Sequence, residues 1–220
     1  EFKAVCDAIL KAGKTPIYEC VSDGWHHTLW FPECSVQAGV VDPTLVDKLN
    51  ENEAVFAGNK TMLTILEQIK DMVDSGYWGD NYMSNEYVNA AQGIVSGEYV
   101  MTVANQGFGT EVNKLDPNFP VENIGYFVMP LADNQTLNMN PSGPSRFIYS
   151  GSKNIEAAKR YMEYMASEKS LTYLTENVAK FNKLAYTNAP STYPKTVQEF
   201  YDSYSTSGTV FQTAVKYVNP

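Results

Sequence analysis

Apolar residues recur every three or four positions in several stretches of this sequence, which is the spacing of one face of an α-helix. The clearest stripe consists of Met62, Ile65, Leu66, Ile69, Met72 and Val73. Gly76 follows it, and glycine is common just beyond a helix end. The pattern also predicts a short helix opening at Asp42-Pro43. Further helices are expected over residues 2–12, 25–37, 85–95, 106–115, 155–165, 168–177, 197–203 and 210–218.

Short apolar runs between these helices predict β-strands. Residues 99–104 are almost continuously apolar and include β-branched side chains, which is typical of a buried strand. Further strands are predicted over residues 15–20, 123–129 and 146–149. Pro130 ends the strand of residues 123–129. The alternation of helices with short strands indicates an α/β domain.

Local signals refine the helix predictions. Pro32 either kinks the helix of residues 25–37 or lies in its first turn. Asn154 is a good N-cap for the helix that follows it. The inward stripe of that helix is expected to be Ala157, Tyr161, Tyr164 and Met165. The chain starts inside a helix without a preceding cap and stops without a clear domain end, so we expect further residues on both sides.

Composition excludes one class of partner and favours another. The chain carries 16 Lys and Arg against 25 Asp and Glu, a net charge of -9. Its basic residues are scattered, whereas a nucleic-acid binder needs them clustered, so no nucleic-acid partner is expected. No stretch approaches the ~20 apolar residues of a membrane helix. The 15 Tyr, 10 Phe and 3 Trp offer apolar faces with polar edges, which suit sugar recognition.

The cysteines and histidines do not have the spacing of metal ligands. Cys6, Cys20 and Cys34 form no C-x-x-C pair. A buried thiol is favoured for Cys6, and one disulfide among the three remains open. His26 and His27 are adjacent, and adjacent residues point away from each other on a helix. We therefore expect no metal and no cofactor.

The sequence also lacks the signatures of common enzyme classes, since it contains no GxSxG, no P-loop and no GxGxxG after a strand. Two carboxylate pairs, Asp23 with Glu33 and Asp80 with Glu86, have the chemistry of glycoside hydrolysis. Nothing in the sequence places either pair in a cleft, and solvated surface charge is the more common role. We assign no catalytic residue and expect the chain not to be an enzyme.

A combination of aromatic and amide residues is the stronger functional signal. Trp25 and Phe108 each follow a polar turn between a strand and a helix, where a side chain can project into a cleft. Sugar C–H faces stack on aromatic rings, and sugar hydroxyls pair with carboxylates and amides. The alternative is that both aromatics belong to the core and that residues 140–143 form only a turn. The candidate ligand-binding residues are Asp23, Trp25, Asn105, Gln106, Phe108, Asn140, Ser142 and Gly143.

Four blocks in a fixed order carry a resemblance to a known family. They are DSGYW at residues 74–78, SGEYVMTVANQGF at 96–108, IGYFVMP at 124–130 and SKNIEAAKRY at 152–161. Their order and spacing resemble the second half of extracellular solute-binding proteins of the sugar-binding ABC-transporter class, family 1, which includes proteins similar to maltose-binding protein. In that family an aromatic residue at the position of Phe108 often stacks on the sugar. Phenylalanine offers a smaller stacking surface there than tryptophan would.

The resemblance implies a fold and a way of working. The fold is an α/β, periplasmic-binding-protein-like (type II) clamp, represented by its C-terminal lobe plus part of the N-terminal lobe. Residues 1–122 and 181–220 would form the second lobe, and residues 123–180 would belong to or cross toward the first, most of which is missing. Asp23 and Trp25 would face the cleft from the second lobe with Asn105, Gln106 and Phe108. Asn140, Ser142 and Gly143 would lie near the first lobe.

The resemblance also implies partners and a location. The protein would capture a mono- or oligosaccharide outside the cell membrane, as a cell-surface lipoprotein or in the periplasm. It would deliver the sugar to the transmembrane subunits of an ABC permease, and it would touch the membrane only through a lipid anchor outside this chain. Without its partner lobe, the segment of residues 124–177 is expected to show an exposed apolar patch or to associate through it. Two alternatives remain, a carbohydrate-active hydrolase domain and a protein-interaction or adhesion module.

Overall fold

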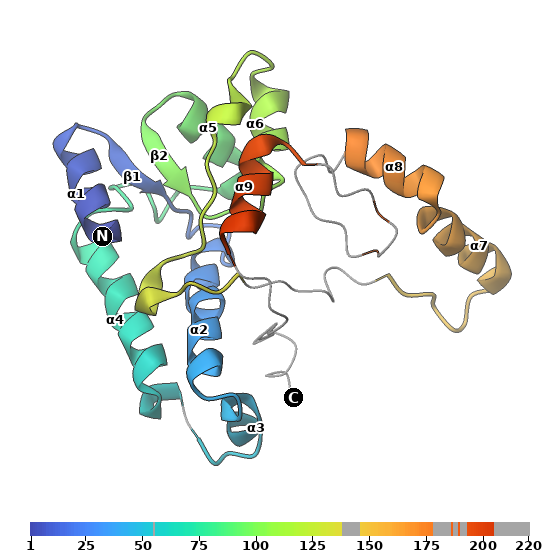
Figure 1. The fold of residues 1–220 in the computed structure, drawn as a ribbon, viewed down its shortest axis with the longest axis horizontal. Helices are drawn as coiled ribbons and strands as arrows, with labels where there is room; N and C mark the ends of the chain where they lie inside the picture. Colours follow the sequence, from blue (N-terminus) through green and yellow to red (C-terminus); the bar gives the residue numbers. More distant parts are fainter. Residues whose placement is uncertain (55, 138–145, 178–185, 187–188, 190–192, 205–220) are drawn as a thin grey trace.

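The computed structural model describes residues 1–54, 56–137, 146–177, 186, 189 and 193–204. Helices dominate it, and a small parallel sheet lies among them (Figure 1). The α-helices are α1 (Phe2–Lys11), α2 (Trp30–Val41), α3 (Leu45–Asn50), α4 (Lys60–Asp74), α5 (Ala90–Val95), α6 (Phe108–Leu115), α7 (Ile155–Met165), α8 (Glu168–Asn177) and α9 (Lys195–Ser203). Short 3₁₀ helices are η1 (His26–Leu29), η2 (Phe56–Gly58), η3 (Tyr87–Asn89), η4 (Val121–Asn123) and η5 (Leu131–Asp133).

The sheet has two strands in the described part of the chain. Strands β1 (Thr15–Tyr18) and β2 (Tyr99–Thr102) run parallel, with Ile17 opposite Met101 and Tyr18 opposite Thr102. Both strands therefore end at the same edge of the sheet, and the segments that follow them lie close together. The crossover between them contains α2, α3, α4 and α5, as a parallel connection requires.

The two other predicted strands are wrong. Residues 123–129 and 146–149 are described, but no strand is assigned to either segment. Each segment has the local composition of a strand, yet a strand exists only when a neighbouring chain pairs with its backbone. Phe147 and Tyr149 are almost fully exposed, so nothing among the described residues covers the second segment.

The sheet separates two apolar clusters, because successive side chains of a strand point to opposite faces. Ile17 belongs to the cluster that includes residues of α1, α2 and α4. Tyr18, the next residue, belongs to the cluster that includes residues of α5 and α6, where its ring meets Tyr99 edge-on at 4.9 Å. The three cysteines are buried free thiols in these clusters, as predicted for Cys6.

The helix predictions that fall on described residues are largely confirmed, and the signals at the helix ends explain why. The helix predicted over residues 210–218 lies outside the described residues. Asn59 caps α4, since its side chain accepts a hydrogen bond from the backbone N–H of Met62 at 3.0 Å. Gly76, at φ 74°, takes the left-handed conformation that ends this helix. Pro32 lies in the first turn of α2, where a missing N–H costs no intrahelical bond. No described helix is both long and apolar enough to cross a membrane.

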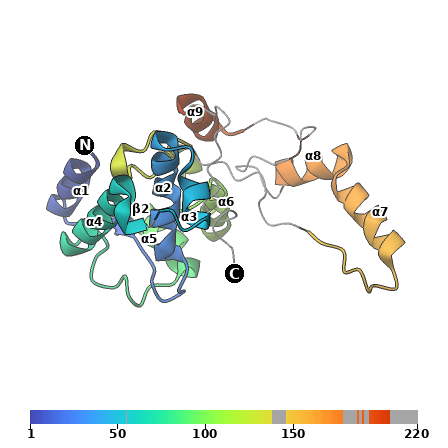
Figure 2. The same ribbon diagram turned by 90° about the horizontal axis from the view of Figure 1, so that it is seen from below.

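Helices α7 and α8 stand apart from the rest of the described chain in both views (Figures 1 and 2). The predicted inward stripe of α7 is wrong, since Ala157, Tyr161 and Tyr164 are exposed and Met165 is only partly buried. The predicted side-chain cap from Asn154 is also absent. An amphipathic helix buries its apolar face only where another surface covers it. As expected for residues 124–177, large apolar side chains are exposed here: Phe127, Phe147, Tyr149, Tyr161, Tyr164 and Tyr173.

Adjacent residues of α4 provide a test of the core. Ile65 is fully buried, whereas Leu66, predicted to lie on the same inward stripe, is 45% exposed. We expect Ile65→Ala to lower the free energy of unfolding by about 2–5 kcal/mol, because it leaves a cavity that the packed core cannot fill. Leu66→Ala should cost less than about 1 kcal/mol. Urea denaturation of both variants measures the difference, and equal losses would contradict this assignment of the core face.

Candidate functional site

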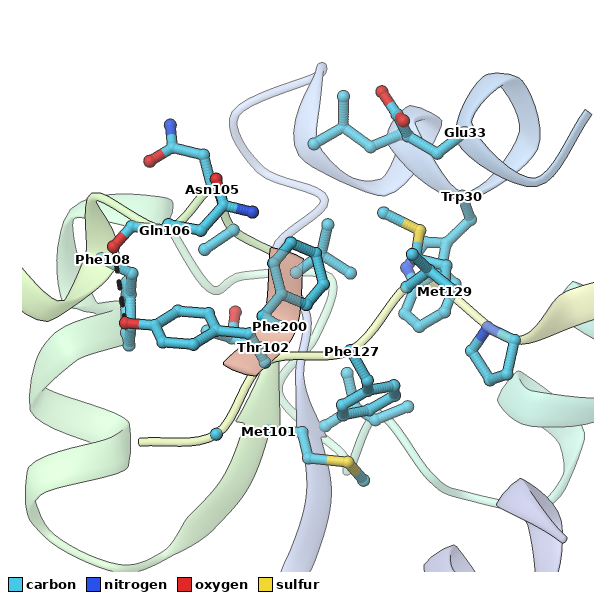
Figure 3. Close-up of a pocket in the computed structure, with 18 of the residues that line it drawn as sticks. Trp30, Glu33, Met101, Thr102, Asn105, Gln106, Phe108, Phe127, Met129 and Phe200 are labelled. Atoms are coloured by element: carbon cyan, nitrogen blue, oxygen red, sulfur yellow. Dashed lines mark hydrogen bonds between the residues drawn. The ribbon is translucent and has the colours of Figure 1, made fainter. Parts of the chain in front are cut away.

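A cavity of about 550 Å³ opens where β1 and β2 end (Figure 3). Many of its lining residues come from the segments after β1, the segments after β2, and residues 124–130, and others include Phe2 and Tyr87. Phe200 of α9 also lines it. Ligands of open α/β sheets commonly bind outside the carboxyl ends of the strands, so this position is the expected one for a binding site.

Trp25 lies on the wall that follows β1. Gly24, at φ 74°, adopts a left-handed turn that few other residues tolerate, and Trp25 follows it directly before η1. Its ring lies 5.4 Å from that of Tyr87 and 5.2 Å from that of His26, and all three residues line the cavity. The Trp25 side chain is nevertheless 47% exposed, so a large part of its aromatic surface is open to a ligand.

Asn105 and Gln106 line the same cavity from the turn between β2 and α6 (Figure 3). The Asn105 side-chain oxygen accepts a hydrogen bond from the backbone N–H of Gly107 at 2.7 Å, which shapes this turn. The backbone carbonyl of Gln106 accepts from the Tyr126 hydroxyl at 3.4 Å, and its side-chain oxygen accepts from the Tyr201 hydroxyl at 3.4 Å. Asn105 is exposed and its amide nitrogen is a donor available at the rim.

Phe108 begins α6 and is only 4% exposed. It lines the cavity, but it also belongs to the apolar cluster with Tyr18 and Val112. Its position therefore favours the alternative that Phe108 is a core residue. It offers the cavity a buried apolar surface instead of an open stacking platform.

Of the remaining predicted candidates for the cavity, only Asp23 is described. Asp23 does not line it, although its carboxylate accepts a hydrogen bond at 2.5 Å from the backbone N–H of Tyr87, which does. Asn140, Ser142 and Gly143 lie outside the described residues. Of the carboxylate pairs considered for hydrolysis, only Glu33 lines this cavity, whereas Asp80 and Glu86 do not.

A fully buried polar cluster lies behind the wall, and the sequence analysis did not find it. Glu19 follows β1 and has no exposed surface, and the same is true of His26. His26 Nδ1 lies 2.5 Å from Glu19 Oε1, and His26 Nε2 lies 2.7 Å from the carbonyl oxygen of Val103. Trp30 Nε1 donates to Glu19 Oε2 at 2.6 Å, and the backbone N–H of Cys20 donates to Glu19 Oε1 at 2.8 Å.

This cluster is also the place where a metal would be sought. Ligand atoms of Glu19, Cys20 and His26 lie within 4.8 Å of one another. Both carboxylate oxygens of Glu19 and both ring nitrogens of His26 already have hydrogen-bond partners, so binding an ion would require breaking these bonds. Burial raises the pKa of the Cys20 thiol to about 12, with the charges of Glu19 and Asp23 adding to it, which disfavours the thiolate that binds metals. The geometry supports a hydrogen-bonded core cluster.

A signal for this cluster was present in the sequence. Glu19 is a charged residue inside the predicted buried strand of residues 15–20, and a buried charge requires a partner. His26 was considered only together with its neighbour as a metal ligand. Tyr126 and Phe200 carried no signal, because they come from distant segments that only the fold brings to the cavity.

Comparison with known proteins gives the family. The family model described as bacterial extracellular solute-binding protein matches residues 1–172, well over half of the chain. No curated protein matches the chain. The family supports a role in solute binding for ABC import and implies a location outside the cytoplasm, and its members are generally not enzymes. A mostly helical chain with a small parallel sheet is compatible with this class. The chain belongs to the bacterial extracellular solute-binding protein family.

Proposed function

We propose that this chain is part of the carbohydrate-binding component of an ABC importer, which captures a mono- or oligosaccharide outside the membrane and delivers it to a permease. The observation that carries the proposal is the cavity of about 550 Å³ beside the carboxyl ends of β1 and β2. It combines an open aromatic face, Trp25, with the amides of Asn105 and Gln106 after β2. Apolar walls with a few placed polar groups are typical of small-ligand sites.

The chemistry of this cavity fits a sugar. Trp25 offers a flat apolar surface for sugar C–H groups, and the amides can donate to or accept from hydroxyls. Phe108 supplies the buried apolar surface. We propose that Asp23 acts indirectly, because its carboxylate fixes the backbone of Tyr87. Asn140, Ser142 and Gly143 are proposed as ligand-binding residues on the resemblance alone.

The clamp and its lobes are part of the same proposal. Residues 1–122 and 181–220 would form the second lobe, and residues 123–180 would belong to or cross toward the first. The exposed aromatic side chains of α7 and α8, and the separation of these helices in Figures 1 and 2, support a covering surface that the described chain does not supply. A lipid anchor outside this chain would keep the protein at the membrane, where the permease lies.

Thermal unfolding in the presence of sugars tests the proposal. We expect one class among mono- and oligosaccharides such as glucose, cellobiose and maltotriose to raise the unfolding temperature. A ligand at 100 times its dissociation constant adds about 2.7 kcal/mol to the free energy of unfolding. The panel should be run on this chain and on a version extended upstream by a first lobe. A shift in the extended version alone supports the clamp, and a shift in neither version contradicts sugar binding.

A further inference from the structure

A buried charge pair lies directly behind the aromatic wall of the cavity, and the proposed function gives it no role. Glu19 and His26 are both fully buried, although charged groups are rarely buried without a purpose or a partner. They come from the segments after β1, and the carbonyl of Val103 that His26 contacts comes directly after β2. The pair therefore joins the ends of the two strands at the edge where the cavity opens.

The contacts of His26 define its protonation state. Its Nδ1 faces the Glu19 carboxylate at 2.5 Å, and its Nε2 faces the Val103 carbonyl at 2.7 Å. The Val103 carbonyl only accepts hydrogen bonds, and so does Glu19 in its ionised form. With Glu19 ionised, both ring nitrogens donate, and only the imidazolium carries two N–H groups. The network therefore assigns a positive charge to His26, balanced by the carboxylate of Glu19.

The same pair contacts three aromatic residues of the wall. Trp30 donates its Nε1–H to Glu19 at 2.6 Å. The ring of His26 lies 5.2 Å from that of Trp25, edge to face, and 5.2 Å from that of Tyr87 at an interplanar angle of 33°. Each of these aromatic residues lines the cavity. A side chain kept in one rotamer by buried partners presents a fixed surface to a ligand.

We infer that Glu19 and His26 are positioning residues of the cavity, and that their charge pair keeps Trp25, Trp30 and Tyr87 in place until His26 loses its proton. A neutral His26 can donate from one nitrogen only, so one of its two contacts, to Glu19 or to Val103, is lost. The aromatic wall then loses a fixed support. The consequence for ligand capture, a weaker affinity once His26 is neutral, rests on the proposed function, whereas the movement of the wall does not.

The groups around His26 determine the direction of the pH dependence. Burial lowers the pKa of His26, but the hydrogen bond and charge of Glu19, the Val103 carbonyl and the charge of Asp23 together raise it above its ordinary 6.5. Two other titratable groups face the cluster. Burial raises the pKa of Cys20 to about 12, and burial with the charge of Glu111 raises that of Tyr87 further still. A transition that starts above pH 6.5 and ends well below pH 12 therefore belongs to His26.

Nuclear magnetic resonance of the whole chain can follow both the His26 imidazole and the Trp30 indole N–H. The chain has two histidines, so His27→Gln leaves His26 as its single imidazole and serves as the matched control. We expect the His26 signal to titrate with a midpoint above pH 6.5 and the Trp30 indole N–H signal to move with the same midpoint. In Glu19→Gln, which keeps the shape and removes the charge, the midpoint should move to lower pH. Circular dichroism over the same range checks that the fold persists.

Each outcome decides the inference. The positioning role is overturned if the imidazole midpoint lies at or below pH 6.5, or if the Trp30 indole signal does not follow that midpoint. The titration of the parent chain gives this answer even if Glu19→Gln does not fold. Glucose, cellobiose and maltotriose are then titrated below and above the midpoint. Affinity that falls with the same midpoint supports the effect on capture, and constant affinity overturns that effect. If the wall moves but no sugar binds at any pH, either to this chain or to the version extended by a first lobe, the proposed function fails and the positioning role stands.

Discussion

Glu19→Ala should lower the free energy of unfolding by about 3–5 kcal/mol near pH 6. Removing one partner of a buried ion pair leaves the other charge in the core without compensation. Glu19 also accepts hydrogen bonds from Trp30 Nε1 and from the backbone N–H of Cys20, and the variant leaves both donors without this acceptor. Since domains are stable by only about 5–15 kcal/mol, this single change would remove a large share of the total.

Urea denaturation measures the loss, and a second carboxylate provides the control. Asp71 pairs with Lys3 at 2.7 Å, but both side chains are more than half exposed. Asp71→Ala should therefore leave the free energy of unfolding nearly unchanged, because exposed pairs are well solvated and screened. If Glu19→Ala costs no more than Asp71→Ala, the buried pair does not stabilise the fold.

The loss should also depend on pH in one direction. The folded-state pKa of His26 is raised above its ordinary 6.5, chiefly by Glu19 against the effect of burial. A raised pKa means that the stabilisation is fully present below pH 6.5 and is lost as the pH rises through the folded-state value. The difference in unfolding free energy between the parent chain and Glu19→Ala should therefore shrink as the pH rises above 6.5. A difference that grows in that range would contradict a charged His26.

The helices were predictable because their patterns are local. The stripe around Ile65 and the terminator Gly76 belong to one continuous segment, and so does the stripe around Cys6. The strands were predictable only in part. Residues 15–18 and 99–102 pair across 80 residues of intervening chain, whereas residues 123–129 have no strand partner among the described residues. A strand is a property of a pair, and a single sequence shows only one member.

The candidate site shows the same limit. Trp25, Asn105 and Gln106 could be chosen because each follows a predicted strand, and all three line one cavity. The family resemblance, which rested on the order of several blocks, is confirmed by the family match. The partnership of Glu19 with His26 could not be predicted, because it depends on how the chain turns between β1 and α2. The exposed face of α7 was mistaken for an inward face, since periodicity shows that a face is apolar but not what covers it.

Trp25→Ala should weaken sugar binding by about 10- to 100-fold while leaving the fold intact. Truncating a central aromatic anchor of a binding site commonly costs about 2 kcal/mol or more, and each 1.4 kcal/mol is a factor of ten in affinity. Trp25 is nearly half exposed and packs mainly on Tyr87 and His26, so its removal opens no large hole in the core. Titration calorimetry with the sugar that gives the largest thermal shift measures the effect.

Two further variants make this result specific. Tyr173→Ala removes an aromatic side chain of α8 that is more exposed than Trp25 and does not line the cavity, so it should leave the affinity unchanged. Trp25→Phe keeps a smaller apolar face and should fall between the parent chain and Trp25→Ala, because the stacking area decreases in steps. If Trp25→Ala binds the sugar as tightly as Tyr173→Ala does, Trp25 is not the stacking platform, and the sugar is bound elsewhere on the chain.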